Sequence, residues 1–290
     1  MKPGASHFHE IRGLRHHVRT WGDERSPTLF LLHGWMDVSA SFQFVVDALQ
    51  DDWHVVAPDW RGFGLSTWAP GGYWFPDYYA DLDALLDLYQ PDTPVNLVGH
   101  SMGGNVALMY AGMRPQRVAH VISLEGFGTP RVASDEAPRR YAQWLDELHE
   151  PTAWKLYESL DALAARLGRD NPRLSAEQAA FLASHRAEQM SDGSVRLRAD
   201  PRHRIVNPVL NRIDENFACW QAIDAPVLWV RGADTTARVL ATDTPRELAQ
   251  RKQAFRNLRE ETIPDCGHMM HFDQPVKLAR VIEEFMRAQR

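Results

Sequence analysis

The chain has few cysteines and no long apolar run, and each absence excludes a class of protein. Only Cys219 and Cys266 are cysteines among its 290 residues. Two cysteines are too few for the disulfide framework of a small secreted domain, so we expect two reduced thiols. The longest apolar runs, such as Val118 to Leu124, are far shorter than the ~20 residues of a membrane-spanning helix. We therefore expect no membrane span.

An excess of positive charge is also missing. The chain carries 32 Lys and Arg against 38 Asp and Glu, a formal net charge of −6. This balance provides no basic field for nucleic acid or anionic lipid. The stretch from Met1 to Glu10 has no apolar segment of the kind that forms a secretory signal. We expect a cytoplasmic protein without a nucleic-acid or membrane partner.

Short apolar runs alternate with amphipathic helical patterns along most of the chain. Such alternation is typical of the α/β class, with a mostly parallel central sheet and helices on both faces. The expected buried strands, each bounded by Gly, Pro or Asp, are Leu29–Leu32, His54–Ala57, Val95–Val98, Val118–Leu124 and Val227–Val230, with a further strand at Phe255–Ile263.

The alternation is interrupted between residues 129 and 218. Helical patterns alone are expected in the first part of this stretch, at Ala137–Glu150, Thr152–Leu167 and Ser175–Glu188. We interpret residues 129–218 as a helical lid inserted into a core made of residues 1–128 and 219–290. Four arginines near its end are either a solvated charged face or a site for a substrate carboxylate: Arg196, Arg198, Arg202 and Arg204.

The segment Gly99-His100-Ser101-Met102-Gly103 fits the pattern G-x-S-x-G. An expected strand leads into it and a helical pattern follows it. A strand-to-helix turn this tight needs small residues beside the serine, because the serine adopts strained backbone angles that raise its hydroxyl clear of the sheet. Ser101 is therefore our candidate nucleophile.

A serine hydroxyl is a poor nucleophile unless a base removes its proton. His268 is the candidate base, because its loop follows the last expected strand and so lies on the same sheet edge as Ser101. His271 competes, but we expect it to line the pocket or cap the next helix. For the oxyanion we assign two backbone amides, those of Met102 and Trp35, since fixed amides stabilise developing charge without reorganisation.

Nothing in the chain calls for a metal or an organic cofactor. The early histidines His7, His9, His16 and His17 alternate irregularly through what we interpret as a surface hairpin. Cys266 lacks any C-x-x-C or His/Cys ligand spacing. We expect no metal site and no cofactor.

Four motifs in order give the chain a specific family resemblance. They are Leu32–Trp35, Pro58–Ser66, Gly99–Gly104 and the pair Gly267-His268 followed by His271 and Pro275. Together they resemble the α/β-hydrolase superfamily in its lidded branch, which includes esterases, carbon–carbon bond hydrolases, epoxide hydrolases and haloalkane dehalogenases. The last two use an aspartate nucleophile, and Ser101 at that position argues against both chemistries. The resemblance implies that Asp59–Ser66 is a structural turn after a strand, with no chemical role.

A carboxylate should orient the imidazole of His268, and the resemblance leaves two candidates. Most relatives carry this acid three residues after the glycine that follows the strand at Val227–Val230; here that position is Thr235, with Asp234 one place earlier. Glu125 closes the strand at Val118–Leu124, where several haloalkane dehalogenases carry theirs. A buried glutamate there would also need a partner. We favour Glu125 and keep Asp234 as the alternative.

These residues predict a serine hydrolase that cleaves a carboxylic ester or related acyl bond of a small molecule through an acyl-enzyme. Two alternatives stay open. One is hydrolysis of a carbon–carbon bond in a diketo acid, which would use the same serine and histidine. The other is a small-molecule receptor that keeps the hydrolase shell without the activity.

Overall fold

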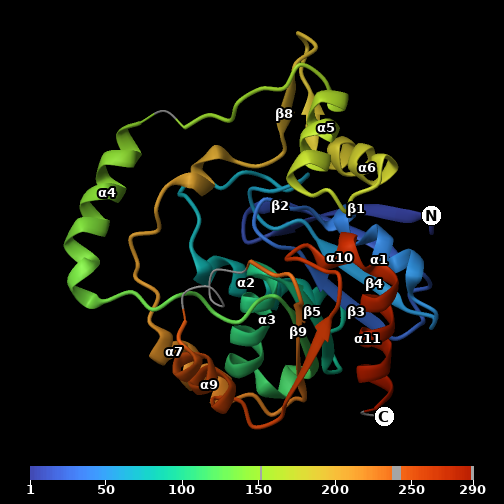
Figure 1. Cartoon of the computed structure of the whole chain (residues 1–290), viewed down its shortest axis with the longest axis vertical. Coiled ribbons are helices and arrows are strands. Elements are labelled where there is room, and N and C mark those ends of the chain that lie inside the picture. Colours follow the sequence, from blue (N-terminus) through green and yellow to red (C-terminus); the bar gives the residue numbers. More distant parts are fainter. Residues whose placement is uncertain (151, 237–242, 289–290) are drawn as a thin grey trace.

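An eight-stranded sheet forms the centre of the computed structural model, which describes residues 1–150, 152–236 and 243–288 (Figure 1). The strand order is β1-β2-β4-β3-β5-β6-β9-β10; β1, β2 and β4 pair antiparallel and all later pairs are parallel. This confirms the α/β class with a mostly parallel sheet. The strands are β1 Gly4–Ile11, β2 Leu14–Trp21, β3 Thr28–Leu32, β4 His54–Pro58, β5 Val95–His100, β6 Val118–Leu124, β9 Val227–Gly232 and β10 Leu258–Ile263.

Helices cover both faces of this sheet, because the side chains of each strand alternate between two apolar layers. In β3, Phe30 and Leu32 pack into one layer and Leu29 and Leu31 into the other. The first layer is shared with α2 Phe75–Tyr89, α3 Met102–Met113 and α9 Pro245–Gln253, and the second with α1 Gln43–Ala48, α10 Met270–Asp273 and α11 Pro275–Arg287. A short 3-10 turn, η1 Ser39–Phe42, precedes α1, and another, η2 Pro115–Arg117, follows α3. No helix among the described residues is long and apolar enough to cross a membrane.

The segment between β6 and β9 contributes none of its described strands to the main sheet. It contains η3 Ser134–Glu136, α4 Ala137–His149, α5 Leu160–Asp170, α6 Ala176–Arg186, β7 Ala187–Gln189, β8 Val195–Leu197, η4 Pro201–Arg204 and α7 Ile213–Gln221. The expectation of helices alone is corrected at β7 and β8, which pair antiparallel as a small hairpin. The expected boundary at residue 218 falls inside α7, whose Trp220 is buried in the layer that contains α3.

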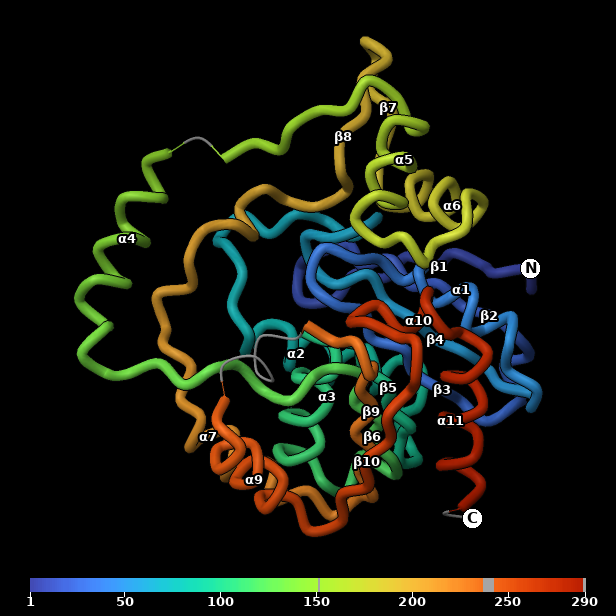
Figure 2. The backbone as a smooth tube through the Cα atoms, viewed as in Figure 1, coloured from blue at the N-terminus to red at the C-terminus, as the bar shows by residue number. Residues whose placement is uncertain are grey.

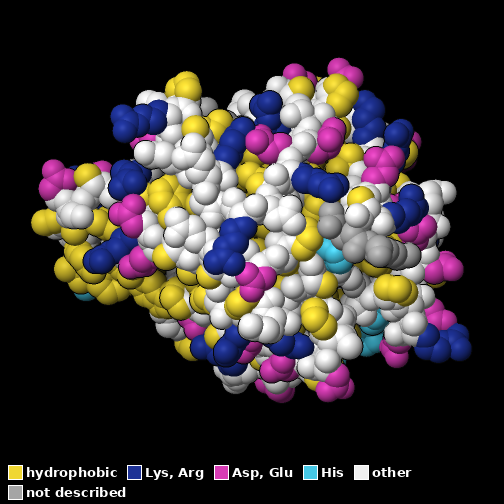
Figure 3. Space-filling view, turned by 90° about the horizontal axis from the view of Figure 1, so that it is seen from below, with side chains coloured by type: hydrophobic (Ala, Val, Ile, Leu, Met, Phe, Trp, Pro, Cys, Tyr) yellow, Lys and Arg dark blue, Asp and Glu magenta, His cyan; other side chains and the backbone are white. Residues whose placement is uncertain are grey.

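Helix α4 lies at the outer edge of the molecule (Figure 2). The segment before α7 runs beside it, with Arg140 Nε donating to the carbonyl of Asn207. None of the residues of α4 is buried, and Tyr141, Leu145 and Leu148 on this helix are each about half exposed. Figure 3 shows hydrophobic side chains gathered at this end of the molecule. The helix therefore adds little buried area to the core.

The N-terminal hairpin differs from our expectation of a surface feature. On β2, His16 and His17 are buried, and His17 Nδ1 lies 2.7 Å from the Asp59 carboxylate. Burial alone would raise the pKa of Asp59, but the hydrogen bond and charge of His17 outweigh it and lower that pKa to about 2. Asp59 also accepts from the backbone of Ser39 and Leu65, so it braces the turn at residues 58–66.

Candidate active site

Ser101 lies at a sharp turn between the end of β5 and the start of α3. Its backbone angles are φ 50° and ψ −109°, in a region that residues with a side chain seldom adopt. The glycines on either side are required, because a Cβ on Gly99 would overlap the backbone of Gly103, and one on Gly103 would overlap that of Leu32. The sequence motif thus has the strand–turn–helix context that it needs.

The loop after β3 passes directly beside this serine. A Cβ built on Gly34 would lie 3.3 Å from the Cβ of Ser101 and 2.8 Å from Nδ1 of His100. Gly34 is followed by Trp35, which is 52% exposed, so the amide of Trp35 comes directly after the residue that is packed against Ser101. Met102 is the first residue of α3, and an amide at that position has no acceptor within its own helix.

A hydrogen bond from His100 holds the loop of His268 against the turn that carries Ser101. Its loop connects β10 to α10, and Nε2 of His100 donates to the His268 carbonyl oxygen at 2.8 Å. The two rings lie 4.9 Å apart between centroids. Because His100 immediately precedes Ser101, this bond brings the loop of His268 to the nucleophile turn. The side chain of His268 is about one-third exposed, at 33%.

Glu125 follows β6 directly and directs a buried carboxylate at His268. Its Oε2 lies 3.2 Å from His268 Nδ1, and its side chain has no exposed surface. Two further donors come from the loop after β9. The amide of Gly232 donates to Oε1 at 2.7 Å, and the hydroxyl of Thr235 donates to Oε2. The carboxylate therefore has three partners despite its burial, as a buried charge requires.

Asp234, the alternative acid, lies on the same loop but is engaged elsewhere. Its carboxylate pairs with Arg173 at 2.7 Å, and both side chains are substantially exposed, Asp234 at 52% and Arg173 at 41%. Its amide donates to the carbonyl of Cys266. Of the two candidate acids, the structure thus brings Glu125 to His268 and joins Asp234 to the segment that follows α5.

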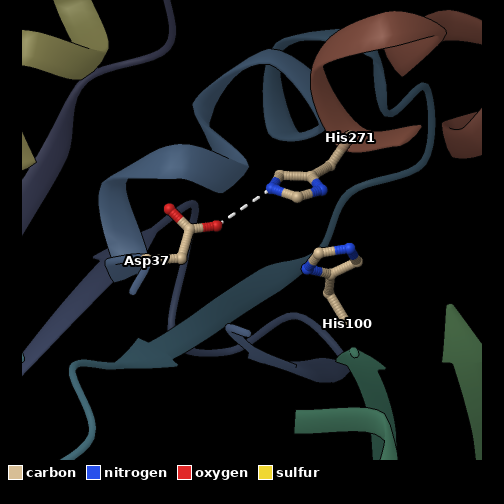
Figure 4. A group of neighbouring side chains, drawn as sticks. All are labelled: Asp37, His100 and His271. Carbon is tan, nitrogen blue, oxygen red and sulfur yellow. Dashed lines mark hydrogen bonds and ion pairs between the residues drawn. The ribbon is translucent and has the colours of Figure 1, made fainter. Parts of the chain in front are cut away.

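A second buried cluster, which sequence reasoning missed, lies behind the nucleophile turn (Figure 4). His271 Nε2 lies 3.1 Å from Oδ2 of Asp37, and Oδ1 of Asp37 accepts from Arg186 at the end of α6. Burial alone would raise the pKa of Asp37, but the charge of Arg186 and the hydrogen bond from His271 hold it well below its usual range. His271 is fully buried, and it does not cap α11, whose N-cap residue is Gln274.

Among the described residues this cluster is the one group with potential metal ligands, because donor atoms of Asp37, His100 and His271 lie within 4.8 Å of one another. Its charge balance does not fit an ion. Arg186 already compensates the single carboxylate, so a divalent cation would leave a buried excess of positive charge. The group fits better as a hydrogen-bonded network that ties α6 to the loop after β3 and to α10.

Comparison with known proteins agrees with this architecture. Residues 27–275 match the family model described as the alpha/beta hydrolase fold. The chain belongs to the α/β-hydrolase family. This hydrolase is 30% identical to the 3-hydroxybutyrate-oligomer hydrolase of Cupriavidus necator over 275 residues, which is 89% of this chain and 88% of that protein. It is 29% identical to a serine hydrolase-like protein of Danio rerio, covering 100% of this chain and 90% of the other.

Solved structures give the same result. The thioesterase domain from the curacin biosynthetic pathway superposes with a TM-score of 0.86 at 25% identity, covering 97% of this chain and 99% of that domain. The structure of E-2-(acetamidomethylene)succinate hydrolase superposes with a TM-score of 0.77 at 23% identity, covering 98% of this chain and 100% of the other. At that identity the second likeness concerns the fold alone.

Proposed function

We propose that this hydrolase cleaves a carboxylic ester or a related acyl bond through an acyl-enzyme formed on Ser101. The observation that carries the proposal is the hydrogen bond from His268 Nδ1 to the buried carboxylate of Glu125. The loop of His268 is held beside the strained serine. That bond leaves Nε2 as the basic nitrogen of His268. A carboxylate in this position orients the ring and stabilises the imidazolium that forms during reaction.

The reaction follows from these roles in two halves. His268 takes the proton of Ser101 as its oxygen attacks the acyl carbon, and the amides of Trp35 and Met102 receive the oxyanion. The carbon–oxygen bond to the leaving group then breaks, and His268 returns the proton to that group. In the second half His268 takes a proton from water, whose oxygen attacks the acyl carbon. The bond between that carbon and Ser101 Oγ then breaks, and His268 returns the proton to Oγ, which releases the acid and restores Ser101 and neutral His268.

The names of two similar proteins support an acyl substrate. One relative is named for hydrolysis of 3-hydroxybutyrate oligomers, and the structural neighbour at 25% identity is named a thioesterase. We extend these names to the present chain only as a class of bond.

The proposal is tested with nitrophenyl esters and a fluorophosphonate probe. We expect Ser101→Ala and His268→Ala each to lower kcat by about 10⁴- to 10⁶-fold, since members of one catalytic unit depend on each other. The probe should label the parent protein and the exposed-serine control Ser184→Ala, but not Ser101→Ala. Labelling that survives Ser101→Ala would contradict the assignment. Faster turnover of a diketo acid than of any ester would favour carbon–carbon cleavage instead.

A further inference from the structure

A pocket lies between the loop after β3 and the segment that joins β6 to β9, close to the proposed nucleophile. Its core side is formed by Met36 to Val38, and its opposite side by residues of α5 and β8 together with Arg198. Apolar and charged side chains share the lining, and the apolar ones include Met36, Val38, Leu163, Leu167 and Leu197. The wall begins at Met36, two residues after Gly34, and Gly34 is packed against Ser101.

The charged residues of this pocket separate into two groups. Arg186 and Arg166 are neutralised by carboxylates that also line it, Asp37 and Asp170. Arg198 has no ion pair with any carboxylate in the part of the chain that the structure describes. Its Nε donates to the carbonyl of Ala187 at 2.9 Å, which fixes the direction of the guanidinium and leaves its two terminal nitrogens for another partner.

The three neighbouring arginines are either paired with a carboxylate or outside the lining of the pocket. Arg196 pairs with Glu188 across the β7–β8 hairpin, and Arg202 pairs with the buried carboxylate of Asp200. Arg204 is exposed and lies over the ring of Trp154. Of the four arginines for which the sequence left a surface role or a substrate role open, Arg198 is the one that lines the pocket.

We propose that this pocket binds the far end of the substrate and that Arg198 recognises a carboxylate carried there. The inference rests on the proposed function and names its substrate class: an ester or thioester with an apolar spacer and a distal carboxylate. A guanidinium presents two parallel N–H donors, which match the two oxygens of a carboxylate. The apolar lining would desolvate the spacer without competing for the charge.

The separation of the pocket from the serine limits the length of the spacer. Consecutive Cα atoms are about 3.8 Å apart, so the Cα of Met36 lies within about 8 Å of the Cα of Gly34. Because a Cβ on Gly34 would lie 3.3 Å from the Cβ of Ser101, the near wall of the pocket lies within about 12 Å of the nucleophile. An extended acyl chain of six to eight carbons covers much of this distance, so both lengths are compared.

The experiment uses matched substrates on the full chain. The mono-4-nitrophenyl esters of adipic and suberic acid are compared with the same esters whose second carboxyl is methylated. We expect the parent protein to have a kcat/KM at least about tenfold higher for each free acid, as for a hydrogen bond to a charged group. Arg198→Gln should abolish that ratio through KM, Arg198→Lys should keep part of it, and Arg196→Gln, which alters a paired arginine two residues away, should leave it unchanged.

The outcomes separate this inference from the proposed function. Ser101-dependent hydrolysis with equal rates for free acid and methyl ester in the parent protein would overturn the carboxylate site alone, and this measurement needs no variant to fold. A preference for the free acid that persists in Arg198→Gln would also overturn it. If neither substrate series is hydrolysed in a Ser101-dependent manner, the proposed function fails first.

Discussion

Two neighbouring strands, β6 and β9, end at the same edge of the sheet, yet the carboxylates that follow them have opposite environments. Glu125 after β6 is buried and accepts from His268, Gly232 and Thr235. Asp234 after β9 is exposed and pairs with Arg173 at the surface. A surface ion pair contributes about 0–1 kcal/mol, whereas leaving a buried charged acceptor without its donors costs more than about 1–3 kcal/mol. The two carboxylates therefore differ in their partners: Glu125 has hydrogen-bond donors that allow its burial, whereas Asp234 has a surface ion pair.

The β9 loop supplies two of these donors. Thr235 occupies the position where most relatives carry the acid, and here its hydroxyl donates to the carboxylate of the adjacent strand. The two strands pair in parallel, Leu124 opposite Val230, so their following loops reach the same imidazole. We therefore expect that an acid after either strand can meet His268, provided that the other loop donates to it.

Removing the charge of Glu125 should have the largest effect on activity. In Glu125→Gln one amide oxygen can still accept from Gly232, but the amide nitrogen then faces His268 Nδ1 and favours the wrong tautomer. We expect kcat for ester hydrolysis to fall about 10³- to 10⁴-fold, the size seen when a triad carboxylate becomes an amide. Circular dichroism and thermal unfolding check that the fold is kept. Activity within tenfold of the parent would remove Glu125 from the proposed mechanism.

Moving the acid to the other strand sharpens the comparison further. We expect Glu125→Gln combined with Thr235→Asp to recover about tenfold or more of the kcat lost in Glu125→Gln, because the new carboxylate starts from a side chain already directed at that position. The measurement is kcat for the double variant against the two single variants. As a control, Thr235→Asp alone should be slower than the parent, since it places two carboxylates together. No recovery would mean that the β9 loop cannot present an acid to His268.

The features that could be predicted from the sequence, the nucleophile turn and the fold class, depend on patterns of residues close together in the chain. The strand before Ser101 and the glycines around it specify the turn within a few residues, and the fold follows from apolar periodicity. The choice between Glu125 and Asp234 could not be made locally, because it depends on which way side chains point across two strands. The pairing of Asp37 with His271 was missed because the two residues are 234 positions apart and Asp37 lies in none of the four motifs.

The segment between β6 and β9 was predicted less well, for a related reason. Strands β7 and β8 have three residues each, too few for an alternating pattern to be visible. The expected helix at Thr152–Leu167 begins only at Leu160, where the side chain of Ser159 accepts from the amide of Ala162 and caps it. Short elements and their ends depend on contacts that periodicity does not encode.

The smallest effect is expected at Asp234, and it tests the other half of the comparison. Because its carboxylate is about half exposed and bonded to Arg173, Asp234→Asn removes a surface ion pair and leaves the hydrogen bonds of Glu125 in place. We expect kcat within about twofold of the parent and an unfolding free energy lower by no more than about 1 kcal/mol. Arg173→Gln is the matched control, since it breaks the same pair from the other side and should behave alike in both measurements. A loss of kcat in Asp234→Asn that Arg173→Gln does not share would mean that the Asp234 carboxylate serves His268 during turnover, and the acid would then belong to β9 as in most relatives.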